Sequence, residues 1–165
     1  MCNIKYFVGI DPGIQGAIAF LKPCGEISVL PMPTILQNKK RNICITRLNQ
    51  RFETGYTLHC TIEKQGMRRG QAVQSTAKTF ENYGILKGIL HAHYHAVSEV
   101  TPQKWKKHLE VPADKKAAQE RATLLMPRAA HLWPLAKDDG KAEAAMIALY
   151  AAQKAGHEIT EVYTR

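Results

Sequence analysis

Four acidic residues occupy positions where the surrounding sequence is apolar. Asp11 directly follows the run IKYFVGI, and Glu63 ends the run TLHCTIE. Asp139 and Glu143 lie in the alanine-rich stretch KDDGKAEAAMIALYAA, where Glu143 interrupts an otherwise apolar helix face. Acidic side chains are rare in or beside buried segments unless something pairs with them. A cation bound between these acids satisfies that requirement.

The chemistry of these four side chains favours a hard metal ion. Asp139 and Glu143 are four residues apart, so in a helix they share one face and repel each other. Carboxylates without histidine or cysteine partners favour Mg²⁺, or Mn²⁺ in its place, over zinc. Two such ions about 3.5–4 Å apart can hold the attacking water and the leaving oxygen of a phosphodiester. Without metal, the same carboxylates are expected to bind protons more readily.

Each acid also has an ordinary explanation when it is taken alone. Asp11 precedes Pro12-Gly13, a sequence typical of turns, and the others fit helix caps or surface acids. The hypothesis of a catalytic site therefore depends on all four acids converging.

The charge balance favours a polyanionic partner. The chain has 23 Lys and Arg residues against 14 Asp and Glu residues, a net charge of +9. Such an excess favours nucleic acid or an acidic membrane surface. Any single cluster can be a solvated face, but without an amphipathic membrane helix the clusters together indicate phosphate backbones. The clusters are Lys39, Lys40, Arg41, Arg47 and Arg51 in the acid-free interval between Glu26 and Glu53; Lys64, Arg68 and Arg69; and Lys104, Lys106, Lys107, Lys115 and Lys116.

The pattern of apolar residues predicts a mixed α/β sheet. We expect three antiparallel strands first and then two strands separated by a helix, with further helices after them. No repeat or linker is visible, so residues 1–165 are expected to form one domain. The expected strands cover 4–10, 16–22, 26–32, 57–63 and 96–100, and the expected helices cover 71–94, a short segment from Pro102, 114–126 and 140–155.

Several other functions are not expected. No apolar run approaches the ~18 residues of a membrane span, and no signal sequence is apparent, so we expect a cytoplasmic protein without membrane association. The cysteines have no C-x-x-C spacing and are expected to be reduced. The histidines His91, His93 and His95 are interpreted as exposed surface rather than a metal site, and Trp105 and Trp133 as packing residues. No nucleophilic side chain is paired with a base, so we expect direct attack by water and no covalent intermediate. We also expect no small-molecule substrate.

Four blocks resemble the RuvC-type Holliday-junction resolvases in order and spacing. They are VGIDPGIQGAIAF, TIEKQG, VTPQKWKKHL and KDDGKAEAAMIALY, and the similarity spans roughly residues 6 to 150. The resemblance is greatest to the branch containing phage-type enzymes and the plant plastid resolvase. The last block is the most specific, whereas the first is shared with actin-like ATPases and sugar kinases.

The resemblance implies a ribonuclease H-like fold, a homodimer with two active sites, and Mg²⁺-dependent nicking of two strands across a four-way DNA junction. Asp11 matches the family's first-strand aspartate, which bridges two metal ions. Glu63 matches the glutamate that closes the fourth strand, and Glu143 matches the acid of the last helix. Asp139 stands where the plastid branch carries histidine, so it either binds an ion or orients water. Asp138 is interpreted as a first-turn acid outside this group.

The basic residues near these blocks are candidates for DNA contacts. In the family, the loop after the Glu63 strand approaches the junction centre, where Met67 could wedge against bases; a plain flexible loop is the alternative. The candidate DNA-binding residues are Lys64, Met67, Arg68 and Arg69 in this loop, with Lys104, Lys106, Lys107 and Lys115 on the phosphate backbone.

Other activities fit the same residues less well. A flap or replication-fork nuclease of the same fold would share the site. A non-catalytic junction-binding protein would be expected to lose acids while keeping its lysines. An actin-like ATPase or kinase needs two lobes and more than 165 residues. A bacterial or phage-infected cell is the expected host, since no transit segment indicates an organelle.

Overall fold

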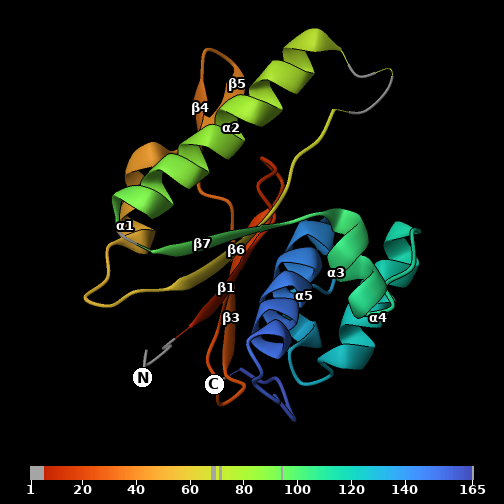
Figure 1. Cartoon of the computed structure of the whole chain (residues 1–165). Coiled ribbons are helices and arrows are strands. Elements are labelled where there is room, and N and C mark those ends of the chain that lie inside the picture. The colour runs from red at the N-terminus through yellow and green to blue at the C-terminus, as the bar shows by residue number, and fades with distance from the viewer. Residues whose placement is uncertain (1–5, 68–69, 71, 94, 165) are drawn as a thin grey trace.

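A five-stranded mixed sheet lies at the centre of the protein, with helices on both faces (Figure 1). The computed structural model describes residues 6–67, 70, 72–93 and 95–164. The first three strands form an antiparallel meander, as expected from the sequence. The last two strands run parallel to the first, which makes the sheet mixed. In sheet order the strands are β3 (Ile27–Pro31), β2 (Ala17–Leu21), β1 (Phe7–Ile10), β6 (His59–Glu63) and β7 (Ala96–Val100).

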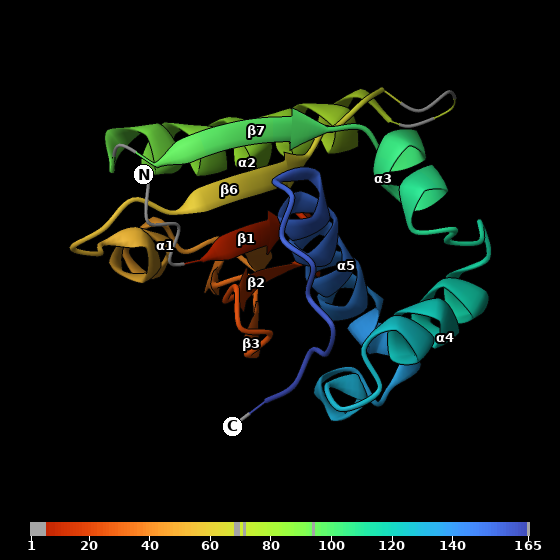
Figure 2. The ribbon, with the colours of Figure 1, turned by 60° about the horizontal axis from the view of Figure 1, so that its bottom comes forward.

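Successive residues of β1 point to opposite faces and so build two apolar cores. Phe7 packs among residues of the helices on one face, whereas Val8 and Ile10 pack among those on the other. The helices on the Phe7 side are α3 (Pro102–His108), α4 (Lys115–Leu125) and α5 (Asp139–Lys154), which lie together on one side of the sheet in Figure 2. The opposite face carries α1 (Ile45–Phe52) and α2 (Val73–Ala92).

Helix α5 packs unusually close to the sheet because both surfaces carry small residues. A Cβ atom added at Gly9 of β1 would lie 2.1 Å from the carbonyl oxygen of Ala144 and 2.3 Å from the amide nitrogen of Ala148. Only glycine leaves room for this approach. The alanines of α5 thus fix the distance at which its first turn meets the end of β1.

The region between β3 and β6 contains elements that the sequence pattern did not reveal. Strands β4 (Thr34–Gln37) and β5 (Lys40–Ile43) form a separate antiparallel hairpin, which α1 follows. Asn38 and Lys39 at its tip have φ of 50° and 62°, the left-handed conformation of a tight hairpin turn. Most side chains of this hairpin are exposed, so its sequence has no alternation of apolar and polar residues to recognise.

The helix boundaries differ from the expected ones by one or two residues where the described residues allow comparison. Asp114 caps α4 by accepting a hydrogen bond from the Ala117 amide at 2.9 Å, so the helix begins at Lys115. Two 3₁₀ turns, η1 (Ala130–Leu132) and η2 (Ala136–Asp138), connect α4 to α5.

The prediction that the histidine cluster is exposed surface is wrong for His95, which is buried. Its Nε2 lies 2.8 Å from the Phe52 carbonyl, and its Nδ1 accepts from the Leu58 amide at 3.4 Å. These two contacts fit a neutral ring, and burial lowers the pKa of His95. The ring therefore ties α1 to the sheet, a structural role that a sequence spacing cannot show.

Trp105 and Trp133 are buried, which confirms their assignment as packing residues. The described cysteines, Cys24, Cys44 and Cys60, are free. Within the described part of the chain, no helix combines the length and apolarity needed to cross a membrane.

Candidate active site

Parallel pairing brings Asp11 and Glu63 to the same edge of the sheet. Ile10, the last residue of β1, is in register with Ile62 of β6. Asp11 and Glu63 are the next residues of these two chain segments, and neighbouring parallel strands end at the same edge. The two acids therefore meet although they are distant in the sequence.

The first turn of α5 brings the other two acids to this edge. A Cβ atom at Gly140 would lie 2.6 Å from the Gln15 carbonyl oxygen and 3.0 Å from Oδ2 of Asp11. The helix thus touches the turn between β1 and β2 directly. Asp139 and Glu143, on either side of Gly140 in the sequence, share a helix face and come from the part of α5 closest to Asp11.

The carboxyl group of Asp11 lies within electrostatic reach of the other three acids. The pKa of its carboxyl group is raised from 3.8 to about 7, first because burial removes hydration and next because of the negative charge on Glu143. The charges on Glu63 and Asp139 act in the same direction, against a hydrogen bond from the Gly13 amide at 3.2 Å. For Asp11, the direction agrees with the expectation that these carboxylates bind protons more readily without a cation.

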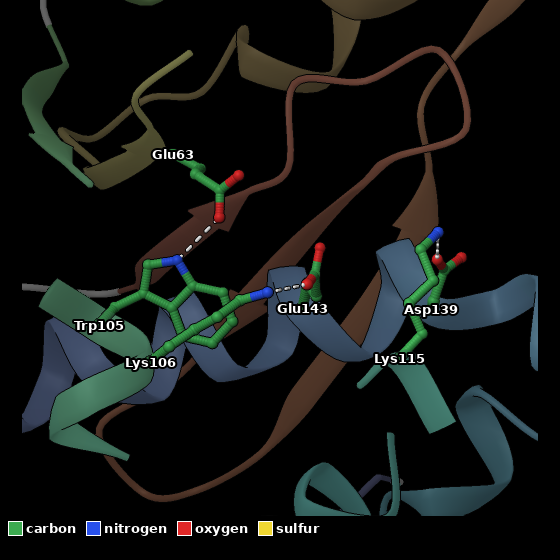
Figure 3. Close-up of polar contacts among 6 residues, drawn as sticks. All are labelled: Glu63, Trp105, Lys106, Lys115, Asp139 and Glu143. Atoms are coloured by element: carbon green, nitrogen blue, oxygen red, sulfur yellow. Dashed lines mark hydrogen bonds and ion pairs between the residues drawn. The ribbon is translucent and has the colours of Figure 1, made fainter. Parts of the chain in front are cut away.

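The other three acids each accept a hydrogen bond from an α3 or α4 side chain (Figure 3). Trp105 Nε1 donates to Glu63 Oε2 at 2.8 Å, and Lys106 Nζ donates to Glu143 Oε1 at 2.7 Å. Asp139 Oδ2 accepts from Lys115 Nζ at 2.7 Å. Two predicted DNA-binding lysines, Lys106 and Lys115, are therefore ion-paired with predicted catalytic acids.

The donor set fits a hard cation in its chemistry, but its side chains are not arranged as a ligand shell. Only carboxylate oxygens are offered, and one of the carboxyl groups has a strongly raised pKa. Among the described residues, however, no group of three or more His, Cys, Asp or Glu side chains is placed to hold a metal ion. Lysine and indole nitrogens lie against the acids instead.

The remaining predicted DNA-binding residues lie around this edge. Lys104 and Lys107 are exposed on α3 and form no ion pair within the described chain. Lys64 and Met67 follow β6, and the Met67 side chain is 81% exposed. They line a cleft of about 370 Å³ that Glu63 also lines. Arg68 and Arg69 lie outside the described residues.

Trp105 has a role at the site that was not predicted from the sequence. Its side chain is fully buried, and its N–H orients the carboxylate of Glu63. A buried indole needs an acceptor for its N–H, which is a signal that could have been used. The signal names no partner, because Glu63 is 42 residues away in the sequence.

Asp138 is held apart from the four acids, in agreement with its interpretation as a residue outside the group. Its Oδ2 accepts from the Leu135 amide at 3.2 Å, and its Oδ1 lies 2.9 Å from Lys141 Nζ. The bond to Lys141 lowers the pKa of Asp138. Asp138 therefore closes the turn that leads into α5.

Comparison with solved structures identifies proteins of the same fold, whereas comparison with family profiles and curated proteins gives no match. No protein-family profile matches the chain, and no curated protein is similar to it. Thermus thermophilus RuvC, solved in complex with a Holliday junction substrate, superposes with a TM-score of 0.58 at 16% identity, over 91% of this chain and 95% of that chain. A second Thermus thermophilus RuvC structure gives 0.49 at 16% identity, over 91% and 96%. The chain thus has the ribonuclease H-like fold of RuvC, and the likeness shows the fold alone.

Proposed function

We propose that this protein is a structure-selective DNA endonuclease that resolves four-way junctions by Mg²⁺-dependent hydrolysis. The observation that carries the proposal is geometric: the paired strands β1 and β6 are followed by Asp11 and closed by Glu63, and Gly140, between Asp139 and Glu143 in the sequence, lies against Asp11. A net charge of +9 and the exposed lysines of α3 support a DNA substrate. The RuvC likeness supports the same class, since that protein was solved with a Holliday junction substrate.

The carboxylates of Asp11, Glu63, Asp139 and Glu143 are the proposed ligands of two Mg²⁺ ions, which Mn²⁺ can replace. Bound ions would offset the charge that builds up on the phosphate and lower the pKa of the attacking water. Support comes from the all-oxygen donor set and from the proton affinity of Asp11, which a cation would lower.

The chain's own residues position these groups. Trp105 fixes the Glu63 carboxylate through its N–H. Lys106 and Lys115 neutralise Glu143 and Asp139 in the structure described, and we propose that they turn to DNA phosphates when the acids bind cations. A water molecule attacks the phosphorus in line with the 3′ oxygen, and the P–O3′ bond breaks. The products are a 5′-phosphate and a 3′-hydroxyl, which a ligase can reseal.

Two nicks in one junction need two active centres, and each chain offers one set of acids. We therefore propose that the whole chain is one nuclease domain that acts as a homodimer, in the phage-type and plastid branch of the resolvases. The same acids would serve a flap or fork nuclease, because junction selectivity depends on how two centres are spaced.

The test is cleavage of a labelled four-way junction, a replication fork and a linear duplex in Mg²⁺. We expect paired nicks in the junction and little cleavage of the other two substrates. Asp11→Asn and Glu143→Gln should each slow cleavage by at least roughly 100-fold, with junction binding retained. Glu120→Gln, a surface acid of α4, is the matched control and should cleave normally.

Each other result has a definite meaning. Equal cleavage of fork and junction would indicate a replication-fork nuclease rather than a junction resolvase. Junction binding without any cleavage would leave a non-catalytic binding protein. Full activity in Asp11→Asn would refute the assigned site.

A further inference from the structure

A basic cleft of about 870 Å³ lies between the β4–β5 hairpin, α1 and the start of α5. We call it the hairpin cleft. Among the described residues that line it, the single acid is Asp138, which is already paired with Lys141. The basic residues of its lining are Arg41, Arg47, Arg51, Lys137 and Lys141. Most of this positive charge has no acidic partner in the cleft.

The hairpin cleft adjoins the candidate active site. Gln15 and Gly16 line it, and they belong to the turn that follows Asp11. Asp138 lines it too, and the next residue is Asp139. The contact of Gly140 with Gln15 and Gly16 joins the two regions. A DNA strand that extends from the four acids in this direction would therefore reach the hairpin cleft next.

Arg51 is the residue of the cleft with a hydrogen-bond donor that has no acceptor among the described residues. Its Nη1 atom is buried and has no hydrogen-bond partner among the described residues. Loss of hydration lowers the pKa of its guanidinium group. A buried donor on a charged group without an acceptor is destabilising, and an anion in the cleft would supply that acceptor.

The neighbouring arginines are placed to bind the same kind of ligand. Arg47 lies one turn before Arg51 on α1, is exposed, and forms no ion pair within the described chain. Arg41 reaches across the hairpin and donates to Thr34 Oγ1 at 3.0 Å. Guanidinium groups bind phosphate in a two-point manner, and these come from two different elements.

We propose that the hairpin cleft binds the sugar–phosphate backbone of a DNA arm that flanks the cleavage site. Cations from the hairpin, α1, η2 and α5 surround it, which suits a chain of phosphates better than one small anion. The cleft's place beside the cleavage site rests on the proposed function. Its affinity for DNA does not, since binding needs neither metal nor hydrolysis.

The test is binding of a fluorescent four-way junction in EDTA, measured by anisotropy across a salt titration. Arg47→Gln and Arg51→Met should each weaken binding roughly tenfold. The slope of log affinity against log salt should fall in magnitude by about 0.9 for each phosphate that the variant no longer neutralises. Lys154→Gln removes the same charge at the far end of α5 and should leave both quantities unchanged.

Thermal unfolding of the same variants separates binding from folding. Arg51→Met removes a buried unpaired donor, so its melting temperature should stay equal to that of the wild type or rise while DNA binding falls. A purely structural Arg51 would give the opposite change in melting temperature. If Arg51→Met is misfolded, the exposed variants Arg47→Gln and Arg41→Gln decide the matter.

Two results would overturn the inference. One is unchanged affinity and salt slope in Arg47→Gln and Arg41→Gln. The other is a wild-type protein that inorganic phosphate or a mononucleotide protects against unfolding through these arginines, with DNA binding unaffected in the variants; the cleft would then be a small-anion site. The binding test needs no cleavage. If the nuclease proposal fails, the cleavage assay described above detects no cut DNA strand, whereas binding in EDTA still depends on the cleft arginines.

Discussion

At the scale of single residues, the four acids are held in two different ways. Asp11 is the acid that responds most strongly, because burial and three negative charges act on it together. Glu63, Asp139 and Glu143 instead rest against Trp105, Lys115 and Lys106. Repulsion between these carboxylates is unfavourable, and a bound cation would reduce it.

The raised pKa of Asp11 predicts how stability depends on pH in EDTA. The folded state binds a proton at Asp11 up to about pH 7, whereas the unfolded chain releases it near its ordinary value of 3.8. The folded state therefore binds more protons in this window, and its stability falls as pH rises through it. Asp11→Asn lacks this loss. The difference in free energy of unfolding between the variant and the wild type should therefore shift in favour of the variant by roughly 4 kcal/mol between about pH 4 and about pH 8.

Urea unfolding of both proteins at several pH values checks this. A constant difference between the two curves would mean that the Asp11 carboxyl group titrates normally. Glu120→Gln, which removes an exposed acid of α4, is the control for the loss of one carboxylate.

At the scale of elements, close packing of α5 on β1 positions the site. The acids of α5 reach Asp11 because glycine and alanine line the contact. Gly9→Ala should therefore destabilise the protein by roughly 3 kcal/mol, since the added Cβ meets backbone atoms that cannot move aside. Chemical denaturation measures the loss.

Gly84→Ala in α2 is the matched control. A Cβ atom there meets nothing within 4 Å, so the change should stabilise the protein by up to about 1 kcal/mol through helix propensity. Equal effects of the two substitutions would show that α5 is not tightly held against β1.

The elements that position the acids were predictable from the sequence, and the hairpin was not. Strands β1 and β6 belong to largely apolar runs that are followed by or end in an acid. Helix α5 is alanine-rich with one internal carboxylate. These patterns are recognisable in the sequence. The β4–β5 hairpin is mostly exposed, so its sequence lacks an apolar alternation. Helix α1 is eight residues long, so its apolar pattern extends over only about two turns. The acid-free basic interval was visible, but its convergence into a cleft requires the fold.

At the scale of the whole molecule, positive charge surrounds a negative centre. Convergence of Asp11, Glu63, Asp139 and Glu143 was predicted from their apolar settings, and their charges do act together on Asp11. The pairing of Lys106 and Lys115 with two of these acids was not predicted, because side-chain partners on separate helices leave no mark in the sequence. The exposed lysines of α3 remain predicted DNA contacts.

Removal of two α3 lysines should weaken DNA binding in a salt-dependent way. Lys104→Gln with Lys107→Gln should reduce the magnitude of the salt slope for junction binding by about 2, since each phosphate contact contributes about 0.9. Lys78→Gln, paired with Glu81 on α2, is the control and should leave the slope unchanged. An unaltered slope in the double variant would remove α3 from the DNA-binding surface.

Calorimetric titration of the protein with Mn²⁺ tests the central claim most directly, because it asks whether the four acids act as one cation site. The wild type should bind the ion, while Asp11→Asn and Glu143→Gln should bind it at least roughly tenfold more weakly. Asp138→Asn, one residue from Asp139 but held by Lys141, should bind it as the wild type does. Wild-type affinity in both Asp11→Asn and Glu143→Gln would contradict the account.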